Sequence, residues 1–409
     1  MSEVAQVPQL RFPEFSGEWE EKRFDSLYPT VRNGFVGVAT PYYVEEGVPY
    51  LQGKNIKSGA INRNGLVYIN ESFHQKSKKS QLRQNDIVMV QSGHVGECAV
   101  ITEEFEDTNC HALLVSTPTH DIDSKFYINY FYSKFGRKKI YRITTGNTIK
   151  HILSSDLKIQ TVSNPSYQEQ QKIAAFLTAV DTKIEQLSKK QELLGEYKKG
   201  SMQQIFSQAI RFKADDGSEF PEWKERRLGD VCSKAKSGGT PRSTTKEYYD
   251  GDIPFLAISD ITRQGKYLTS ASKKISQLGI DNSASWIVPI DTIIYSMYAS
   301  VGFVSINKIP LATSQAVINL IVKDGYSIEF IYYHLIEVKK TIHKFIETGT
   351  QGNLNAQTVK SLILNIPSLP EQAKIANFLS SIDNKIEQVG KQLDESKQFK
   401  KALLQQMLV

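Results

Sequence analysis

The residue types that usually mark catalysis or metal binding occur in this chain without the spacing that such chemistry needs. No G-x-x-x-x-G-K-[ST] phosphate loop and no G-x-G-x-x-G turn is present, so nucleotide hydrolysis and dinucleotide binding lack their signatures. The seven histidines show no metal-ligand spacing. Cys98, Cys110 and Cys232 stand at no C-x-x-C spacing and are interpreted as small apolar core residues in a reducing compartment. We therefore expect no metal site.

One string does suggest chemistry. Asn164-Pro165-Ser166-Tyr167 resembles the Asn-Pro-Pro-Tyr motif with which adenine-N6 methyltransferases hold a flipped base. The matching string later in the chain, Ile366-Pro367-Ser368-Leu369, keeps only Pro-Ser, and no glycine-rich loop for S-adenosylmethionine lies upstream. These strings are better explained as entries to helices.

The helix that follows each string is a repeat. Residues 169–186, EQQKIAAFLTAVDTKIEQ, and 371–388, EQAKIANFLSSIDNKIEQ, are identical at twelve of eighteen positions. A Ser-x-x-Glu capping box, Ser166 with Glu169 and Ser368 with Glu371, opens each copy. Each helix is expected to run for roughly forty residues, on the order of 60 Å. Gly200 predicts fraying or a kink in the first helix.

Apolar residues recur in both helices at alternating spacings of four and three, the pattern of a coiled-coil seam. The seam positions are Ile173, Leu177, Val180, Ile184, Leu187, Leu194, Ile375, Leu379, Ile382, Ile386, Val389 and Leu393. Two such helices in one chain favour antiparallel pairing within the chain, with homodimerisation as the alternative. Phe176 and Phe378 widen the apolar stripe and are predicted to dock partner helices.

The repeat extends over the segments that precede each helix. Residues 19–24 are echoed by 223–228, 48–51 by 253–256, and 86–88 are aligned with 291–293. Short β-branched runs predict strands at 87–90, 99–102 and 112–115, and again at 292–295, 303–306 and 316–322. Aromatic-rich helices follow at 126–135 and 328–346, and we interpret their aromatic side chains as core.

The sequence thus predicts an α+β fold of two tandem mixed α/β domains, each followed by a long helix, with internal pseudo-twofold symmetry. The predicted parts are a lead segment at 1–18, domain 1 at 19–164, helix 1 at 165–210, a linker at 211–222, domain 2 at 223–366 and helix 2 at 367–409. A chain of 409 residues with 40% hydrophobic and 23% charged residues is ordinary for a soluble two-domain protein. No membrane span or export signal is expected, so a cytoplasmic location follows. The net charge of +6 is compatible with nucleic acid without establishing it.

Together these features resemble the specificity (S) subunits of type I restriction-modification systems. The resemblance covers nearly the whole chain. It is carried by the two E-Q-x-K-I-A-x-F-L-x-x-x-D-x-K-I-E-Q helices, the W-[EK]-E-[KR]-R openings, and Ser237–Pro241 followed by Gly251–Leu256. It implies that two target-recognition domains each read one half of a split double-stranded DNA target, while the paired helices fix the distance between the halves.

The same resemblance implies partners. Two modification subunits would carry S-adenosylmethionine and methylate adenines, and two restriction subunits would translocate and cleave DNA with ATP and Mg²⁺. No cofactor and no catalysis are then expected on this chain. A self-contained DNA adenine methyltransferase and a coiled-coil scaffold that binds only protein are the competing classes.

The residues expected to contact DNA lie in polar loops that interrupt the predicted strands. Arg and Lys can donate to guanine, Asn and Gln pair with adenine, and lysines also hold phosphates. In domain 1 the candidates are Lys54, Asn55, Lys57, Gln91, Ser92, His94, His111, Asn147 and Lys150. In domain 2 they are Arg242, Ser243, Thr244, Lys246, Ser259, Asp260, Arg263, Tyr295, Tyr298, Gln315, Gln351 and Asn353. For each of them a solvated loop residue is the alternative.

Overall fold

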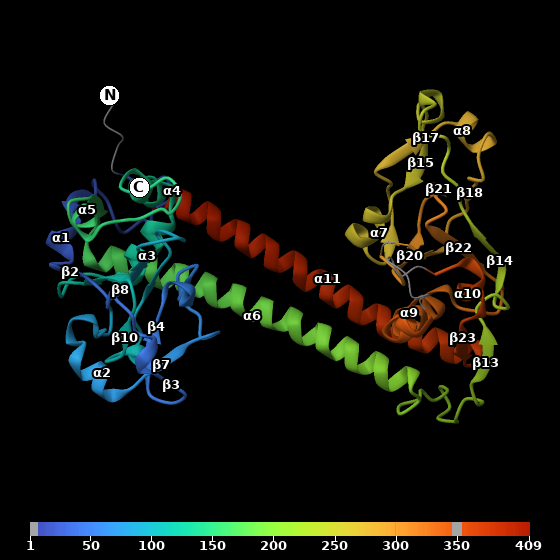
Figure 1. Ribbon diagram of the computed structural model, residues 1–409, viewed down its shortest axis with the longest axis horizontal. Coiled ribbons are helices and arrows are strands. Elements are labelled where there is room, and N and C mark those ends of the chain that lie inside the picture. Colours follow the sequence, from blue (N-terminus) through green and yellow to red (C-terminus); the bar gives the residue numbers. More distant parts are fainter. Residues whose placement is uncertain (1–6, 299, 346–353) are drawn as a thin grey trace. The chain divides into compact units, whose positions relative to one another are not determined.

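The computed structural model describes residues 7–298, 300–345 and 354–409. The chain forms two compact units, of which unit 1 joins Met1–Lys189 with Gly390–Val409 and unit 2 is Lys190–Val389. Each unit holds one globular domain and a part of both long helices (Figure 1). Domain 1 is the part of unit 1 that precedes the first long helix, and domain 2 is the part of unit 2 between the two long helices. None of the helices in the described ranges is long and apolar enough to cross a membrane.

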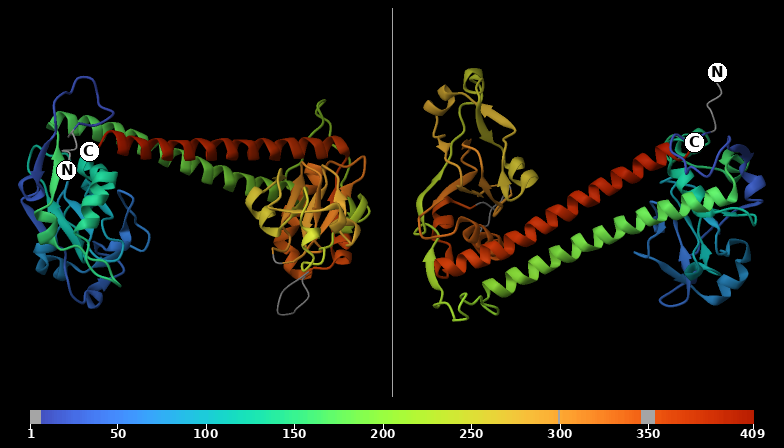
Figure 2. Two further views of the ribbon diagram at one scale, coloured as in Figure 1. Left: turned by 90° about the horizontal axis from the view of Figure 1, so that it is seen from above. Right: turned by 180° about the vertical axis from the view of Figure 1, so that it is seen from behind.

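The two long helices are α6 (Tyr167–Phe206) and α11 (Leu369–Gln406), and they run antiparallel within each unit (Figures 1 and 2). In unit 1, Lys400 Nζ lies 2.5 Å from Asp181 Oδ1 across the pair. In unit 2, Lys198 Nζ lies 2.5 Å from Asp383 Oδ1. Because these four residues occupy matching places in the repeat, they form the same interaction twice, as pseudo-twofold symmetry requires. The predicted antiparallel pairing is confirmed.

Helix α6 continues through Gly200 to Phe206, so the fraying predicted near Gly200 is wrong, whereas a kink there stays a prediction. Glycine costs about 1 kcal/mol relative to alanine inside a helix. The next turn carries Met202 and Ile205, which are 4% and 3% exposed and pack into the core of domain 2. Their burial offsets the cost, since a fully buried side chain of this size contributes about 1.5–3 kcal/mol.

The predicted seam positions lie inside the protein along both helices. Eight of the twelve are buried, and Val180, Ile184, Leu194 and Ile386 are half-buried. Ile173 and Leu177 of α6 belong to the core of domain 1 together with Met407 and Leu408, which directly follow α11. The same stripe that pairs the helices therefore also anchors them to the domains.

Domain 1 is built on two small sheets. The first is fully antiparallel, with the strand order β2 (Thr30–Asn33), β11 (Leu113–Thr117), β8 (Ile87–Val90), β9 (Cys98–Val100). The second has the order β10 (Asn109–Cys110), β4 (Val48–Leu51), β7 (Val67–Ile69), β3 (Tyr43–Val44). Two strand pairs complete it: β1 (Glu20–Arg23) with β12 (Thr161–Asn164), and β5 (Ile56–Lys57) with β6 (Ala60–Ile61). The helices are α1 (Phe24–Leu27), α2 (Glu71–Lys76), α3 (Ser124–Tyr132), α4 (Lys134–Arg142) and α5 (Ser154–Lys158).

Domain 2 repeats this arrangement. Its first sheet has the order β14 (Cys232–Ser237), β22 (Val317–Val322), β19 (Ile293–Ser296), β20 (Val304–Asn307), β16 (Tyr267–Leu268). Its second has the order β17 (Lys273–Ile275), β15 (Ile253–Leu256), β21 (Leu311–Thr313), β18 (Ile287–Val288), and β13 (Lys224–Arg227) pairs with β23 (Ile363–Ile366). The helices are α7 (Ile258–Gln264), α8 (Gln277–Asp281), α9 (Ile328–Val338) and α10 (Ala356–Ser361). The predicted α+β class with tandem domains is confirmed.

The structural register between the domains differs by one residue from the predicted alignment of 86–88 with 291–293. Asn85 and Asp291 both adopt positive φ, 69° and 60°, at the turn before the central strand. Their backbone N–H groups donate to Ile101 and Asn307 at 2.9 and 2.8 Å, so these are the equivalent residues. Because side chains alternate along a strand, a slip of one residue exchanges the faces.

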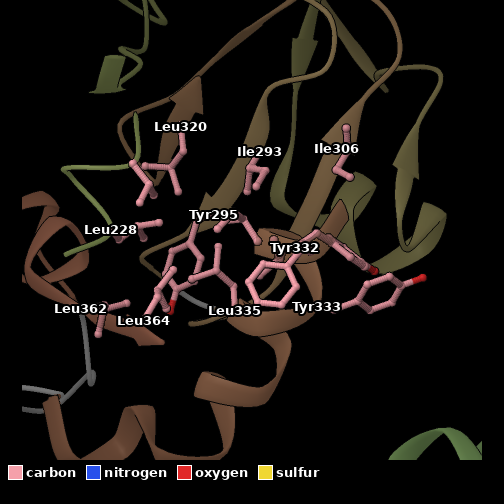
Figure 3. Close-up of a cluster of buried hydrophobic side chains, with 14 of the residues drawn as sticks. Leu228, Ile293, Tyr295, Ile306, Leu320, Tyr332, Tyr333, Leu335, Leu362 and Leu364 are labelled. Atoms are coloured by element: carbon pink, nitrogen blue, oxygen red, sulfur yellow. The ribbon is translucent and has the colours of Figure 1, made fainter. Parts of the chain in front are cut away.

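Tyr295, a predicted DNA contact, lies on the central strand β19, whose four residues are all buried. Its side chain is 0% exposed and lies in the core of domain 2 with Ile293, Ile306 and Leu320 (Figure 3). The prediction for this residue is corrected: Tyr295 is a core residue. The aromatic side chains of α3 and α9 lie in the two cores, as predicted, and Phe126, Tyr127 and Phe330 are 0% exposed.

Each long helix is attached to its domain by the same buried ion pair. Arg11 donates from Nε and Nη2 to both carboxylate oxygens of Glu169, at 2.8 Å each. Arg211 holds Glu371 in the same way, at 3.2 and 2.9 Å. Neither predicted capping box forms in full, because both glutamates bond an arginine, and Ser368 Oγ has no hydrogen-bond partner among the described residues. Ser166 Oγ does accept from the backbone of Glu169 at 3.3 Å.

The glutamine that follows each of these glutamates makes a second contact between helix and domain, and this contact is the same in both domains. Gln170 accepts a hydrogen bond from the backbone N–H of Asp123 at 3.0 Å, at the start of α3. Gln372 accepts one from Ser327 at 2.8 Å, at the start of α9. Each glutamine also donates, at 2.9 Å, to the proline carbonyl before its own helix. Both domains are thus mounted on the helices by one set of contacts.

Candidate nucleic-acid interface

A cleft of about 1060 Å³ opens on domain 1 beside α4 and collects residues from four separate segments. These segments are the turns at 53–58 and 92–97, helix α4 and the loop that ends at Lys150. The predicted residues Lys54, Lys57, Ser92, His94 and Lys150 all line it. The fold therefore brings together most of the domain 1 candidates, which lie far apart in the sequence. We call this the domain-1 cleft.

The charge of the domain-1 cleft is positive. Lys54, Lys57, Lys138, Lys150 and Arg137 supply five cations, and Glu97 is the one acidic residue of its lining. Its lining also includes apolar side chains such as Val95 and Ile140. Cations beside apolar side chains suit a ligand with an anionic backbone and apolar faces.

Glu97 organises the wall of the cleft. It accepts hydrogen bonds from the backbone of Ser58 at 2.7 Å, from the Tyr132 hydroxyl at 2.9 Å and from Arg137 at 2.8 Å. Burial raises the pKa of Glu97, but these donors outweigh it and hold the pKa below its ordinary value. The guanidinium of Arg137 also stacks 4.4 Å from the centre of the Tyr132 ring. The carboxylate thus fixes three segments of the cleft.

Two loops at the mouth of the cleft support each other. The backbone of Gly93 donates to Lys150 O at 3.2 Å, and that of Ile152 donates to Gln91 O at 2.9 Å. Ser92 Oγ lies 2.8 Å from His151 Nδ1. Gln91 is half-buried, whereas Asn147 is exposed in the second loop. Both loops therefore present their side chains from a defined backbone.

Two of the domain 1 candidates have other surroundings. Asn55 is 0% exposed, accepts from the backbone of Gln52 at 3.0 Å and donates to Asn62 O at 3.0 Å. Its prediction is corrected, since its amide is used to hold the turn that presents Lys54. His111 is half-buried and lies outside the cleft, with Nδ1 at 3.2 Å from the Tyr50 hydroxyl.

Six of the domain 2 candidates lie on two segments that adjoin the ends of strand β17. Arg242, Ser243, Thr244 and Lys246 are exposed in the loop that leads to Tyr248. The backbone of Ser276, at the carboxyl end of β17, donates to Tyr248 O at 2.9 Å. Helix α7, which carries the exposed Ser259 and Arg263, adjoins Ser272 at the opposite end.

Lys273 and Lys274, exposed on β17 itself, fill the interval between these two groups. The exposed Gln315 accepts a hydrogen bond from Thr240 at 2.7 Å, and Tyr298 is 38% exposed. Gln351 and Asn353 lie outside the described residues. The six candidates of the loop before Tyr248 and of α7 therefore flank one strand, β17.

Asp260 requires the same correction as Asn55. It is 0% exposed and accepts from the backbone N–H groups of Ala257 and Ser272, both at 3.0 Å. Burial raises the pKa of Asp260, yet these backbone donors hold the pKa below its ordinary value. Asn55 and Asp260 occupy equivalent turns, so one structural role explains both.

The two domains present different chemistry at equivalent positions. In domain 1, Arg137 forms an ion pair with Glu97 at 2.8 Å. At the equivalent place in domain 2, Lys339 Nζ lies 3.1 Å from the centre of the Phe303 ring. The glycines beside them, Gly96 and Gly302, keep φ values of 82° and 78°. A shared scaffold thus carries unlike surfaces.

The sequence reasoning missed helix α4 as part of the interface. Lys138 and Tyr141 line the domain-1 cleft, and Tyr141 is 75% exposed. The signal was available, because Lys134–Arg142 (KFGRKKIYR) holds five cations in nine residues.

The residues predicted to dock partners and the methyltransferase-like string are both partly engaged within the chain. Phe176 is 36% exposed and meets Phe12 edge-on, with ring centres 5.8 Å apart. Phe378 is half-buried and meets Phe212 at 5.7 Å. Asn164 Oδ1 accepts from the Tyr127 hydroxyl at 2.7 Å, so its amide has a structural partner.

The chain is of the class that carries two like domains in tandem, each attached to a pair of antiparallel helices, and the cationic cleft of domain 1 suits a polyanionic ligand. The family model described as the type I restriction modification DNA specificity domain matches residues 16–194 and 221–396. The chain therefore belongs to the family of type I restriction-modification DNA specificity proteins, and the resemblance stated from the sequence is confirmed.

Individual relatives agree with this family. The type I restriction enzyme MjaIX specificity subunit of Methanocaldococcus jannaschii is 32% identical over 193 residues, covering 46% of this chain. That alignment spans less than half of the relative, 44% of its length. The MjaVIII specificity subunit of the same organism is 23% identical over 416 residues, covering 98% of this chain and 93% of the relative.

A solved structure has the same fold. The S subunit of a type I restriction-modification system from M. genitalium superposes with a TM-score of 0.62 at 19% identity. The superposition covers 98% of this chain and 99% of that one. At this identity the likeness concerns the fold.

Proposed function

We propose that this chain is the non-catalytic DNA-recognition subunit of a type I restriction-modification complex. Each domain reads one half of a bipartite, asymmetric target in double-stranded DNA. The paired helices α6 and α11 set the length of the spacer between the halves and dock two modification subunits. S-adenosylmethionine belongs to those subunits, and ATP and Mg²⁺ belong to two restriction subunits.

The observation that carries this proposal is a contrast between two parts of the domains. The contacts that attach each domain to the long helices are the same in both domains, whereas the loops differ. The Arg11–Glu169 and Arg211–Glu371 pairs are the same contact, made once in each unit. The loops on the two domains differ in charge and shape, as the Glu97–Arg137 pair and the Phe303–Lys339 contact illustrate. If the two domains read unrelated sequences independently, their loops must differ while their attachment to the helices stays the same.

The proposed docking of modification subunits rests on the outer face of the helices. Phe176 is 36% exposed beside the seam. Phe399 and Tyr197, at matching places in the repeat, are 53% and 55% exposed. Exposed aromatic side chains at corresponding positions of two helices suit two copies of one partner.

The test is a methylation map. The chain is expressed with its modification subunits in a host that lacks other adenine methylation, and N6-methyladenine is located by long-read sequencing. We expect two half-sites of unrelated sequence separated by a fixed number of unspecified base pairs. One uninterrupted motif, or two identical halves, would contradict the proposal.

A second arm separates this role from that of a self-contained methyltransferase. The purified chain alone is incubated with DNA and labelled S-adenosylmethionine. We expect no methyl transfer until the modification subunits are added. Transfer by the chain alone would contradict the proposal.

A further inference from the structure

An exposed aliphatic side chain stands among polar residues at the mouth of the domain-1 cleft. The loop Gly146–Lys150 is exposed at every position, and Ile149 is 58% exposed. Its neighbours Asn147 and Lys150 are hydrogen-bonding side chains, and Lys150 lines the cleft. Ile149 contributes nothing to a core here, so its side chain is free to make an apolar contact with a ligand of the cleft.

The loop is closed at its base and held in one conformation. Thr145 and His151 exchange two backbone hydrogen bonds of 2.9 Å. Gly146 has a φ of 94°, and a Cβ at this position would lie 2.2 Å from the carbonyl oxygen of Ile149. The bond from Gly93 to Lys150 O fixes the other side at 3.2 Å. A preorganised loop loses little conformational entropy when its tip contacts a ligand.

The surrounding charge selects the ligand. Lys54, Lys57, Lys138 and Lys150 line the adjoining cleft, which favours a polyanion over an apolar protein surface. On a DNA duplex, the apolar group that a side chain meets in the major groove is the 5-methyl group of thymine. The Ile149 side chain is of the right kind for that contact.

We propose that Ile149 reads a thymine of the domain 1 half-site by packing against its 5-methyl group. The inference rests on the proposed function and deepens it, since it names one base pair and the atom that is recognised. Asn147, two residues away in the same loop, is placed to pair with adenine N6 and N7 at the same or the adjacent base pair. Gly146–Lys150 then forms a loop that reads A·T pairs.

The experiment uses the complex with its modification subunits and a duplex that carries the mapped target. Each thymine of the domain 1 half-site is replaced in turn by deoxyuridine, which lacks only the 5-methyl group. We expect one replacement to weaken binding roughly fourfold, the effect of removing one methyl from an apolar contact. Ile149→Ala should bind the thymine and deoxyuridine duplexes equally.

Ile159→Ala is the matched control, because Ile159 is 56% exposed and lies outside the loop. It should keep the fourfold preference. The inference is overturned if no replacement weakens binding, if Ile149→Ala keeps the preference, or if the half-site contains no thymine on either strand. A further duplex carries the fluorescent base 2-aminopurine in the domain 1 half-site. If its fluorescence rises on binding only when Ile149 is present, and binding is insensitive to deoxyuridine, the side chain inserts between bases. That result would also overturn the inference.

These outcomes are distinct from failure of the proposed function. A complex that binds no duplex with sequence preference would contradict the proposed function itself. A complex that binds and methylates its target, with a flat response to deoxyuridine, would contradict only the role of Ile149.

Discussion

Lys54 and Asn55 are neighbours in the chain, but only one of them faces solvent. Both are polar residues in a loop, and the sequence offers no local feature that tells which side chain turns inward. The structure uses Asn55 to accept the backbone of Gln52, and Asp260 does the same for Ala257 in domain 2. The repeat held this signal: a short polar acceptor at the same position in both copies is typical of a structural turn.

This difference gives a prediction for two adjacent substitutions. Lys54→Ala should weaken DNA binding by the assembled complex and lower the slope of log affinity against log salt by about 0.9, the effect of one lost phosphate contact. Asn55→Ala should leave a buried donor unsatisfied and cost about 1–3 kcal/mol of unfolding free energy. Binding across a salt series and thermal unfolding of both variants measure the two effects. A stable Asn55→Ala protein with altered sequence preference would show that Asn55 contacts DNA after all.

At the scale of elements, the helices were predictable and their caps were not. The four-three spacing of apolar residues persists over many turns, so α6 and α11 followed from the pattern alone. Glu169 and Glu371 fit a local capping rule, yet each bonds an arginine far away in the sequence. A local motif cannot show that a long-range partner will compete for the same carboxylate.

The proposed role of the helices in setting the spacer length gives a prediction at this scale. Lys198–Asp383 and Lys400–Asp181 keep the two helices in register, so both must be lengthened together. Insertion of four residues after Gln191 and four after Leu393, its equivalent, adds roughly 6 Å of helical rise. We expect unchanged half-sites with a spacer longer by about two base pairs in the methylation map.

The control for the insertion replaces four residues at each of these sites with the same four amino acids and keeps the length. It should retain the original spacer. If the longer helices change the half-sites and leave the spacer as it was, the helices do not measure the distance.

At the scale of the whole chain, the internal repeat made the architecture accessible from sequence. Two equivalent domains were predicted from the matching motifs that begin at Trp19 and Trp223 and from the two long helices. Unrelated segments do not share such motifs in the same order. The details between them depended on backbone geometry. The positive φ of Asn85 and Asp291 sets a register that sequence similarity placed one residue away.

The loops that carry the site are the least predictable part. Their polar residues pointed to DNA, but the domain-1 cleft depends on how Glu97 joins Ser58, Tyr132 and Arg137, which no spacing encodes. The cationic helix α4 is joined to the domain-1 cleft by this network, through Arg137. Base readout depends on such tertiary placement more than on composition.

Replacement of domain 1, residues 19–164, by the corresponding domain of another family member tests the central claim most directly. The buried contacts of Glu169 and Gln170 with the domain are retained by keeping the residues equivalent to Asp123 and the lead segment with Arg11. A methylation map of the chimaeric complex should show one half-site exchanged, with the other half-site and the spacer unchanged. A map in which both half-sites change together, or neither does, would contradict the claim that each domain reads its own half-site independently of the other.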